Sequence, residues 1–251
     1  ICNIFFSGCN LRCVYCQNHE ISRPSGGCRS RISGLGEALD LIESLLGDGV
    51  QAVGFVSPSH VVPQVKAIIR GLHSRGLRPV FVYNTNGYDK AEVIGSLEGL
   101  IDVWLPDYKY ASEAVALEYS DAADYPSVAL GALKLMYWMK GSPLQTDSEG
   151  RAVGGILIRH LVLPGHADES RLVLRKIAGE LSPGVNISLM SQYHPTPKVA
   201  GHPVLGRALY KAEYDSVVKE MEELGFRNGW LQDPESCLNY RPDFSRDHPF
   251  E

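Results

Sequence analysis

The chain has 251 residues, and the 44% that are hydrophobic are enough to form the core of one large α/β domain. Its formal net charge of -5 argues against binding to nucleic acid or to an anionic membrane, because both require an excess of Lys and Arg. The six cysteines lack the dispersed pattern of a secreted disulfide framework, and the most apolar stretch is too short to span a bilayer. We therefore expect a cytoplasmic protein without a nucleic-acid or membrane partner.

Short apolar segments of the strand type alternate along the chain with segments of helical periodicity. We expect strands at residues 1–6, 51–56, 79–83, 102–105, 156–163 and 187–190. Helices are expected between them, the longest over residues 111–140 with a break near Pro126, and the last clear helix at residues 208–224. Residues 141–155 are rich in Gly, Ser, Pro and Asp and predict a small hairpin.

Strands that are separated by helices run parallel, with right-handed crossovers. Six such units are too few for a closed eight-stranded barrel, so we predict an α/β fold, a partial (β/α)6 TIM-like barrel of parallel strands with outer helices. We expect one domain over residues 1–251 that ends in an irregular tail over residues 233–251. Because the chain begins inside a predicted strand, we expect the natural protein to carry a segment before Ile1.

Three cysteines with the spacing CxxxCxxC, Cys9, Cys13 and Cys16, follow the first predicted strand. Thiolates at this spacing can hold three corners of a cubane iron–sulfur cluster, which normally takes four cysteines, so one iron stays open. Three alternatives remain: a structural zinc site, which needs four ligands, unrelated buried cysteines, which rarely lie so close together, and an electron-transfer cluster with a fourth ligand from Cys28 or Cys237. An open iron can chelate an amino acid, and if that amino acid carries a sulfonium, one electron can cleave a carbon–sulfur bond.

Polar residues stand at the carboxyl end of every predicted strand, where parallel α/β folds bind their ligands. These ends are residues 9–16, 57–60, 84–87, 107–109, 164–166 and 192–194. Arg159 and His160 are adjacent on a strand and must face opposite sides, and we expect Arg159 to face the site. Each feature alone has a structural explanation: Asp107 and Lys109 could form a surface ion pair, and residues 86–87 could form a turn.

Several segments together resemble the radical S-adenosylmethionine superfamily. They are FSGCNLRCVYCQN at residues 6–18, NTNG at 84–87, DYK at 107–109, IRHLVLPG at 158–165 and YH at 193–194. Within the superfamily the chain is most similar to pyruvate formate-lyase activating enzymes and an uncharacterised branch of their homologues. The resemblance implies an oxidoreductase with a 4Fe-4S cluster on Cys9, Cys13 and Cys16. The reduced cluster would cleave S-adenosyl-L-methionine to methionine and a 5′-deoxyadenosyl radical that abstracts hydrogen.

The resemblance also implies a set of cofactor-binding residues: Tyr15, Ser57, Asn84, Thr85, Asn86, Asp107, Lys109, Arg159, Tyr193 and His194. Tyr15 would lie by the adenine, with Tyr193 and His194 on the same side, and Arg159 would pair with the cofactor carboxylate. Residues 54–59 lack the family's glycine pair, which puts the ammonium contact there in doubt. Asn84 stands where the activating enzymes have an aspartate near a monovalent cation, which weakens the case for a cation, although Asp107 could still serve.

The resemblance implies partners as well. If it extends to function, the substrate is a glycine of a glycyl radical enzyme, and a flavodoxin or ferredoxin supplies the electron. Radical modification of a small molecule or a peptide is the alternative substrate class. Two further hypotheses from other classes are a non-catalytic iron–sulfur electron-transfer protein and a zinc-stabilised binding module.

Overall fold

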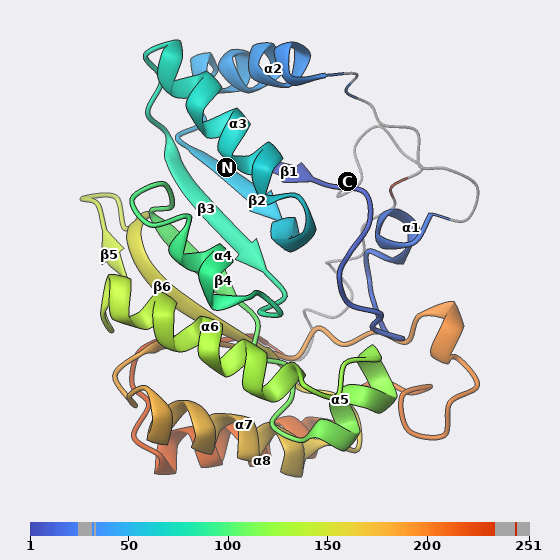
Figure 1. Cartoon of the computed structure of the whole chain (residues 1–251). Coiled ribbons are helices and arrows are strands. Elements are labelled where there is room, and N and C mark those ends of the chain that lie inside the picture. The colour runs from blue at the N-terminus through green and yellow to red at the C-terminus, as the bar shows by residue number, and fades with distance from the viewer. Residues whose placement is uncertain (25–31, 33, 234–243, 245–251) are drawn as a thin grey trace.

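The computed structural model describes residues 1–24, 32, 34–233 and 244. A parallel sheet forms its centre, with the strand order β1-β2-β3-β4-β6-β7-β8. The strands are β1 (Cys2–Phe5), β2 (Ala52–Val56), β3 (Val80–Thr85), β4 (Val103–Pro106), β6 (Ala152–Leu161), β7 (Asn186–Met190) and β8 (Gly229–Leu231). Helices cover the outside of the curved sheet (Figure 1), which confirms the predicted partial TIM-like barrel.

The helices alternate with the strands as the periodicity predicts. They are α1 (His19–Ser22), α2 (Leu35–Gly47), α3 (Val62–Ser74), α4 (Ala91–Gly95), α5 (Glu113–Ser120), α6 (Tyr125–Lys140), α7 (Ala167–Glu180) and α8 (Lys211–Glu223). Short 3-10 turns form η1 (Pro58–His60) and η2 (Pro197–Val199). None of the helices in the described ranges is long and apolar enough to cross a bilayer.

The expected break in the long helical stretch is present, and one strand was not expected. The long helical stretch is broken before Pro126, because Asp121 adopts the left-handed conformation (φ 55°) that ends α5. Pro126 lies in the first turn of α6, where its missing N–H costs nothing. The seventh parallel strand, β8, was not expected, because it is three residues long and exposed. The expected hairpin is present: β5 (Gln145–Thr146) pairs antiparallel with the start of β6.

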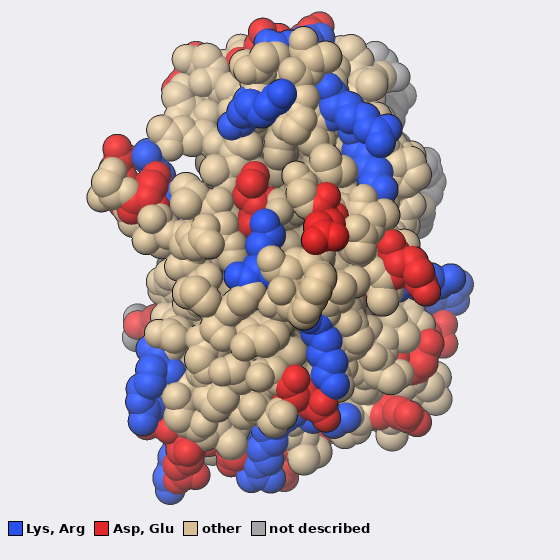
Figure 2. All heavy atoms as spheres, turned by 60° about the vertical axis from the view of Figure 1, so that its left-hand side comes forward, with Lys and Arg blue, Asp and Glu red and all other residues tan. Residues whose placement is uncertain are grey.

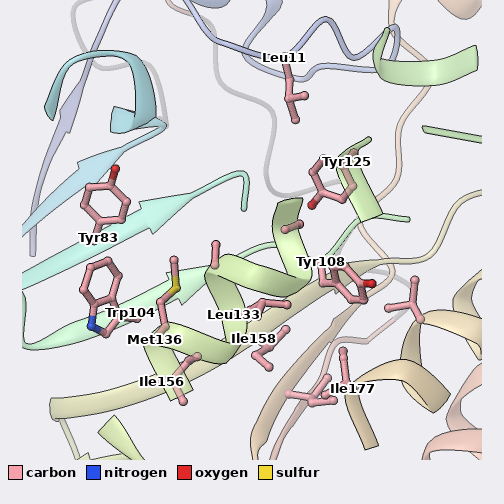
Figure 3. Close-up of a cluster of buried hydrophobic side chains, with 14 of the residues drawn as sticks. Leu11, Tyr83, Trp104, Tyr108, Tyr125, Leu133, Met136, Ile156, Ile158 and Ile177 are labelled. Carbon is pink, nitrogen blue, oxygen red and sulfur yellow. The ribbon is translucent and has the colours of Figure 1, made fainter. Parts of the chain in front are cut away.

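The two faces of the sheet have different neighbours. Outward side chains such as Tyr83, Trp104 and Ile158 are buried beneath the helices, and Figure 3 shows Tyr83 beside Trp104, with Met136 of α6 next to them. The inner face is apolar near the amino ends of the strands, where Val82, Leu105 and Leu157 help to line a cavity of about 620 Å³. Asn84 and Arg159 lie on the same face nearer the carboxyl ends of the strands.

The surface drawn in Figure 2 carries mixed charges. Lys and Arg side chains are interspersed with Asp and Glu side chains, and no large patch of one sign forms on this face. This distribution agrees with the small net charge of -5.

Candidate cofactor site

The cysteine loop is fixed by segments that lie far away in the sequence. The backbone N–H groups of Arg12 and Val14 donate to the carbonyls of Ser120 and Tyr119, at 3.1 and 2.8 Å. On the other side, Thr196 Oγ1 donates to the carbonyl of Val14 at 3.1 Å. In Figure 1 the loop after β1 accordingly lies between α5 and the segment that follows β7. The loop is thus held at the carboxyl ends of the strands.

All three cysteines of the motif are half-buried free thiols. Cys9 Sγ accepts hydrogen bonds from Asn86 Nδ2 at 3.4 Å and from the backbone N–H of Leu11 at 3.5 Å. Cys16 Sγ lies 3.4 Å from the hydroxyl of Ser22. Donors directed at the sulfur stabilise a thiolate, which is the form that binds a metal.

The Cys13 sulfur lies beside Ser120 and is influenced by the charge of Lys109. Burial raises the pKa of the Cys13 thiol to about 11, although the Lys109 ammonium and the Ser120 hydroxyl act in the opposite direction. Ser120 Oγ donates to Cys13 Sγ at 3.0 Å. The charges of Cys16 and Cys9 also act on Cys13, so the three sulfurs and Lys109 belong to one electrostatic environment.

Within the described ranges, no three His, Cys, Asp or Glu side chains converge on a point that would hold a single metal ion. A cubane cluster binds each thiolate through a different iron, so its ligands need not converge in that way. Three thiols with hydrogen-bond donors at their sulfurs are a donor set of the kind that such a cluster takes. The alternative fourth ligands, Cys28 and Cys237, lie outside the described residues.

A buried ionic group lies on the inner face next to the loop. Asp107 Oδ2 lies 2.6 Å from Lys109 Nζ, and Asp107 Oδ1 lies 2.7 Å from Arg159 Nη2. Arg159 Nη2 also donates to Asn84 Oδ1 at 2.6 Å. Burial would raise the pKa of Asp107, but the charges of Arg159 and Lys109 outweigh it, and the pKa lies below its ordinary value. Asp107 and Lys109, for which a surface ion pair was one explanation, are therefore part of a buried cluster.

Two polar atoms of this cluster have no hydrogen-bond partner in the described structure. They are Asp107 Oδ1 and Arg159 Nε. Asp107 Oδ1 forms an ion pair with Arg159 Nη2, and the aligned hydrogen bond of Nη2 goes to Asn84 Oδ1. Buried polar groups are normally paired, and an acceptor beside a donor is therefore suited to a polar ligand.

Arg159 and His160 point in opposite directions, as strand geometry requires. The His160 side chain is 2% exposed, and its Nδ1–H donates to the carbonyl of Tyr108 at 2.8 Å. The hydroxyl of Ser170 on α7 bonds His160 Nε2 at 2.9 Å. Burial lowers the pKa of His160 to about 4. His160 thus joins the sheet to α7, and Arg159 is left to face the inside of the barrel.

Asn86 and Gly87 connect the third strand end to the cysteine loop. Besides Cys9, Asn86 Nδ2 donates to Asn10 Oδ1 at 2.7 Å. Gly87 has φ +82°, and an added Cβ would lie 2.1 Å from the carbonyl oxygen of Asp107. Only glycine combines this backbone angle with so close an approach. The Asn86-Gly87 pair is thus a turn that also supports the site.

Thr85 and Ser57 are both close to Asn84, but their side chains are placed differently. The Thr85 side chain is fully buried on the face opposite Asn84, where it donates to Asp89 and bonds Ser59 Oγ at 3.0 Å. Its hydroxyl is therefore directed away from Arg159. Ser57 has a left-handed backbone (φ 51°), and its N–H donates to the carbonyl of Asn84 at 2.8 Å. The backbone of Ser57 thus lies next to Asn84 at the carboxyl ends of the strands, whereas the Thr85 side chain lies on the other face of the sheet.

The aromatic residues of the expected adenine side lie together. Tyr15 is buried, and its ring centroid is 6.2 Å from that of Tyr193. The Tyr193 hydroxyl donates to the carbonyl of Leu205 at 2.6 Å, and His194 follows it half-buried. Gln17 Nε2 also donates to the carbonyl of Gln192 at 2.9 Å, so this strand end contacts the cysteine loop directly.

Three tyrosine and serine residues of the site were not predicted. Tyr110 and Ser120 form hydrogen bonds with Tyr15 and Cys13, and the hydroxyl of Tyr125 donates to the carbonyls of Asn86 and Asp107. The signal in the sequence is the density of tyrosines, with five between residues 88 and 125. Buried tyrosines usually find a partner for the hydroxyl, so such a cluster indicates a polar network.

Comparison with known proteins places the chain among proteins of similar fold. It is 27% identical over 228 residues to an uncharacterised protein of Methanocaldococcus jannaschii, covering 87% of this chain and 60% of that protein. SuiB of Streptococcus suis superposes with a TM-score of 0.60 at 9% identity, over 92% of this chain and 49% of SuiB. The maturase HydG of Carboxydothermus hydrogenoformans superposes with a TM-score of 0.59 at 15% identity, over 94% of this chain and 55% of HydG. No family model matches.

One structure of SuiB contains bound S-adenosylmethionine, and this chain superposes on it with a TM-score of 0.59 at 10% identity, over 92% of this chain and 50% of that one. At such identities the likeness shows the fold alone. The chain spans less than two thirds of each of these proteins. The structure and its neighbours therefore define an α/β protein of the partial TIM-like barrel type.

Proposed function

We propose that this protein is a radical S-adenosylmethionine enzyme, with a 4Fe-4S cluster on Cys9, Cys13 and Cys16. The observation that carries the proposal is the buried ion pair beside the cysteine loop, in which Arg159 Nε and Asp107 Oδ1 have no hydrogen-bond partner. An amino acid complements this pair, because its carboxylate accepts from a guanidinium and its ammonium donates to a carboxylate. The reduced cluster, when bound, supplies the electron that cleaves the sulfonium.

The residues of the chain would orient the cofactor from two sides. Arg159 and Lys109 present positive charge to its carboxylate, and Asp107 presents negative charge to its ammonium. Tyr15 and Tyr193, whose ring centroids lie 6.2 Å apart, would provide apolar surface for the adenine. Asn86 would contact the ligand cysteine Cys9 through its side-chain amide.

The proposal is tested by anaerobic reconstitution with iron and sulfide, followed by reduction and addition of S-adenosylmethionine. The wild-type protein is expected to bind about four irons and to release methionine and 5′-deoxyadenosine. Cys13→Ser should abolish both, whereas Cys2→Ser, which alters a half-buried cysteine outside the motif, should retain both. A stable cluster that never cleaves the cofactor would indicate electron transfer instead, and stoichiometric zinc without iron would indicate a binding module.

For the substrate we propose a glycine of a partner protein, on the basis of the activating-enzyme resemblance in residues 6–18. A flavodoxin or ferredoxin would supply the electron. The test is to incubate the reconstituted protein with a glycyl radical enzyme from the same organism and S-adenosylmethionine, and to record electron paramagnetic resonance spectra. A glycyl radical signal supports this substrate. Cofactor cleavage without that signal favours a small molecule or a peptide.

A further inference from the structure

A chain of three buried hydroxyl groups leads from the aromatic side of the site to the sulfur of Cys13. The hydroxyls of Tyr15 and Tyr110 are 2.6 Å apart, and the hydroxyl of Tyr110 lies 2.7 Å from that of Ser120. Ser120 Oγ lies 3.0 Å from Cys13 Sγ. The exposed fractions are 6% for Tyr15, 0% for Tyr110 and 1% for Ser120, so water does not compete for these bonds.

The direction of the chain follows from counting protons. Each hydroxyl has one proton to donate, and a metal-bound thiolate can only accept. When Ser120 donates to Cys13, Tyr110 must therefore donate to Ser120, and Tyr15 must donate to Tyr110. All three O–H dipoles then point toward the sulfur. Hydrogen bonds aligned in this way polarise one another, especially in a buried site.

The chain is held rigidly in place. Ser120 is the last residue of α5, and its carbonyl and that of Tyr119 receive the N–H groups of Arg12 and Val14. The Tyr110 ring packs edge-on against Tyr125, with the ring centroids 5.4 Å apart. Backbone contacts on both sides of Cys13 thus fix the distance between the Ser120 hydroxyl and the sulfur.

We propose that Tyr15, Tyr110 and Ser120 form a hydroxyl relay that sets the reduction potential of the cluster through Cys13. The inference rests on the proposed function, because it requires a cluster on this thiolate. Hydrogen bonds to a ligand sulfur stabilise the reduced state, which carries more negative charge, and so raise the potential. Ser120 is the direct donor, and Tyr110 and Tyr15 are positioning residues that strengthen it.

The test is a redox titration of the reconstituted protein, followed by electron paramagnetic resonance without S-adenosylmethionine. Ser120→Ala is expected to shift the midpoint potential to a more negative value, because the donor to Cys13 is lost. Tyr110→Phe keeps the Ser120 donor and should give a smaller shift in the same direction. Circular dichroism and iron content check that each variant is folded and loaded.

The matched controls are Tyr137→Phe and Ser142→Ala, which remove another tyrosine–serine hydroxyl contact, of 2.9 Å, at the end of α6. Both should keep the wild-type potential. If Ser120→Ala does not assemble a cluster, Tyr110→Phe decides the question. Unchanged potentials in both relay variants, or an equal shift in the controls, overturn the relay and leave the proposed function intact. Failure of the wild-type protein to assemble a cluster overturns the proposed function itself.

Discussion

The guanidinium of Arg159 lies 2.7 Å from the carboxylate of Asp107, and the side chains of both residues are mostly buried, with 23% and 12% exposed. The two residues come from β6 and the end of β4, which are adjacent in the sheet. Charges so enclosed require good partners, because burial without one is costly. A change in the Arg159–Asp107 contact should therefore affect both the stability of the protein and the binding of a charged ligand at this end of the sheet.

Replacing Arg159 with Ala should weaken binding of S-adenosylmethionine while the cluster still assembles, because Arg159 does not contact the cysteines. It should also lower the free energy of unfolding by about 2 kcal/mol, less than for an isolated pair because Lys109 remains bound to Asp107. Calorimetric titration and urea denaturation measure the two effects. Arg175→Ala, which breaks a more exposed pair with Glu220, is the control and should lower the free energy of unfolding less than Arg159→Ala does. Loss of iron from the Arg159 variant would contradict this assignment.

Replacing Gly87 with Ala should destabilise the protein by about 3 kcal/mol or more, because the new Cβ would meet backbone as well as adopt a strained φ. Gly99 provides the comparison: its φ is +72°, and nothing lies within 4 Å of an added Cβ. Gly99→Ala should therefore cost only about 1 kcal/mol, from strain alone. Thermal and urea unfolding measure both. Equal costs would show that the approach of Gly87 to Asp107 is unimportant.

Replacing Tyr125 with Phe removes the hydroxyl that joins the ends of β3 and β4. Its OH donates to the carbonyls of Asn86 and Asp107 and accepts from the N–H of Lys109 at 2.9 Å. The buried groups left without a partner should cost about 1 to 3 kcal/mol in unfolding free energy. Tyr137→Phe, at a less buried site, should cost less. A Tyr125→Phe protein as stable as the wild type would show that water replaces the hydroxyl.

Stability should fall between pH 6.5 and pH 4 because of His160. Its pKa is about 4 in the folded protein and near 6.5 when unfolded, so the unfolded state takes up the proton first. The contribution is fully present above pH 6.5 and is lost as the pH falls toward 4, on the order of 2 to 3 kcal/mol. His160→Asn should be less stable at pH 7 and show a flatter pH dependence over this range. If the stability of the variant still falls steeply between pH 6.5 and pH 4, another group causes the loss.

The order of the elements follows from the sequence because parallel strands are buried on both faces and read as short apolar runs. That is why the strands around residues 52–56, 80–85 and 186–190 were found. The strand β8 escaped because Trp230 and Leu231 are exposed and form no buried run. In the tail, Phe244 packs on Phe5 with ring centroids 5.4 Å apart.

The site was predictable where a residue stands at a strand end, and less so where the contact is distant in sequence. Asn84, Asp107 and Arg159 come together because alternate residues of neighbouring strands share a face. The same alternation turns Thr85 away. Ser120 meets Cys13 across 107 positions of sequence. No local spacing encodes such a contact, because it depends on where α5 ends.

The anchoring of the cysteine loop has a consequence for the order of events during synthesis. The N–H of Val14 bonds to Tyr119, and its carbonyl bonds to Thr196, so both partners emerge from the ribosome long after the cysteines. Until then the loop has neither support, and the three thiols remain in a flexible nascent segment. Assembly of the proposed cluster would therefore follow translation of most of the chain, and a truncation before residue 196 should yield a protein that does not retain iron.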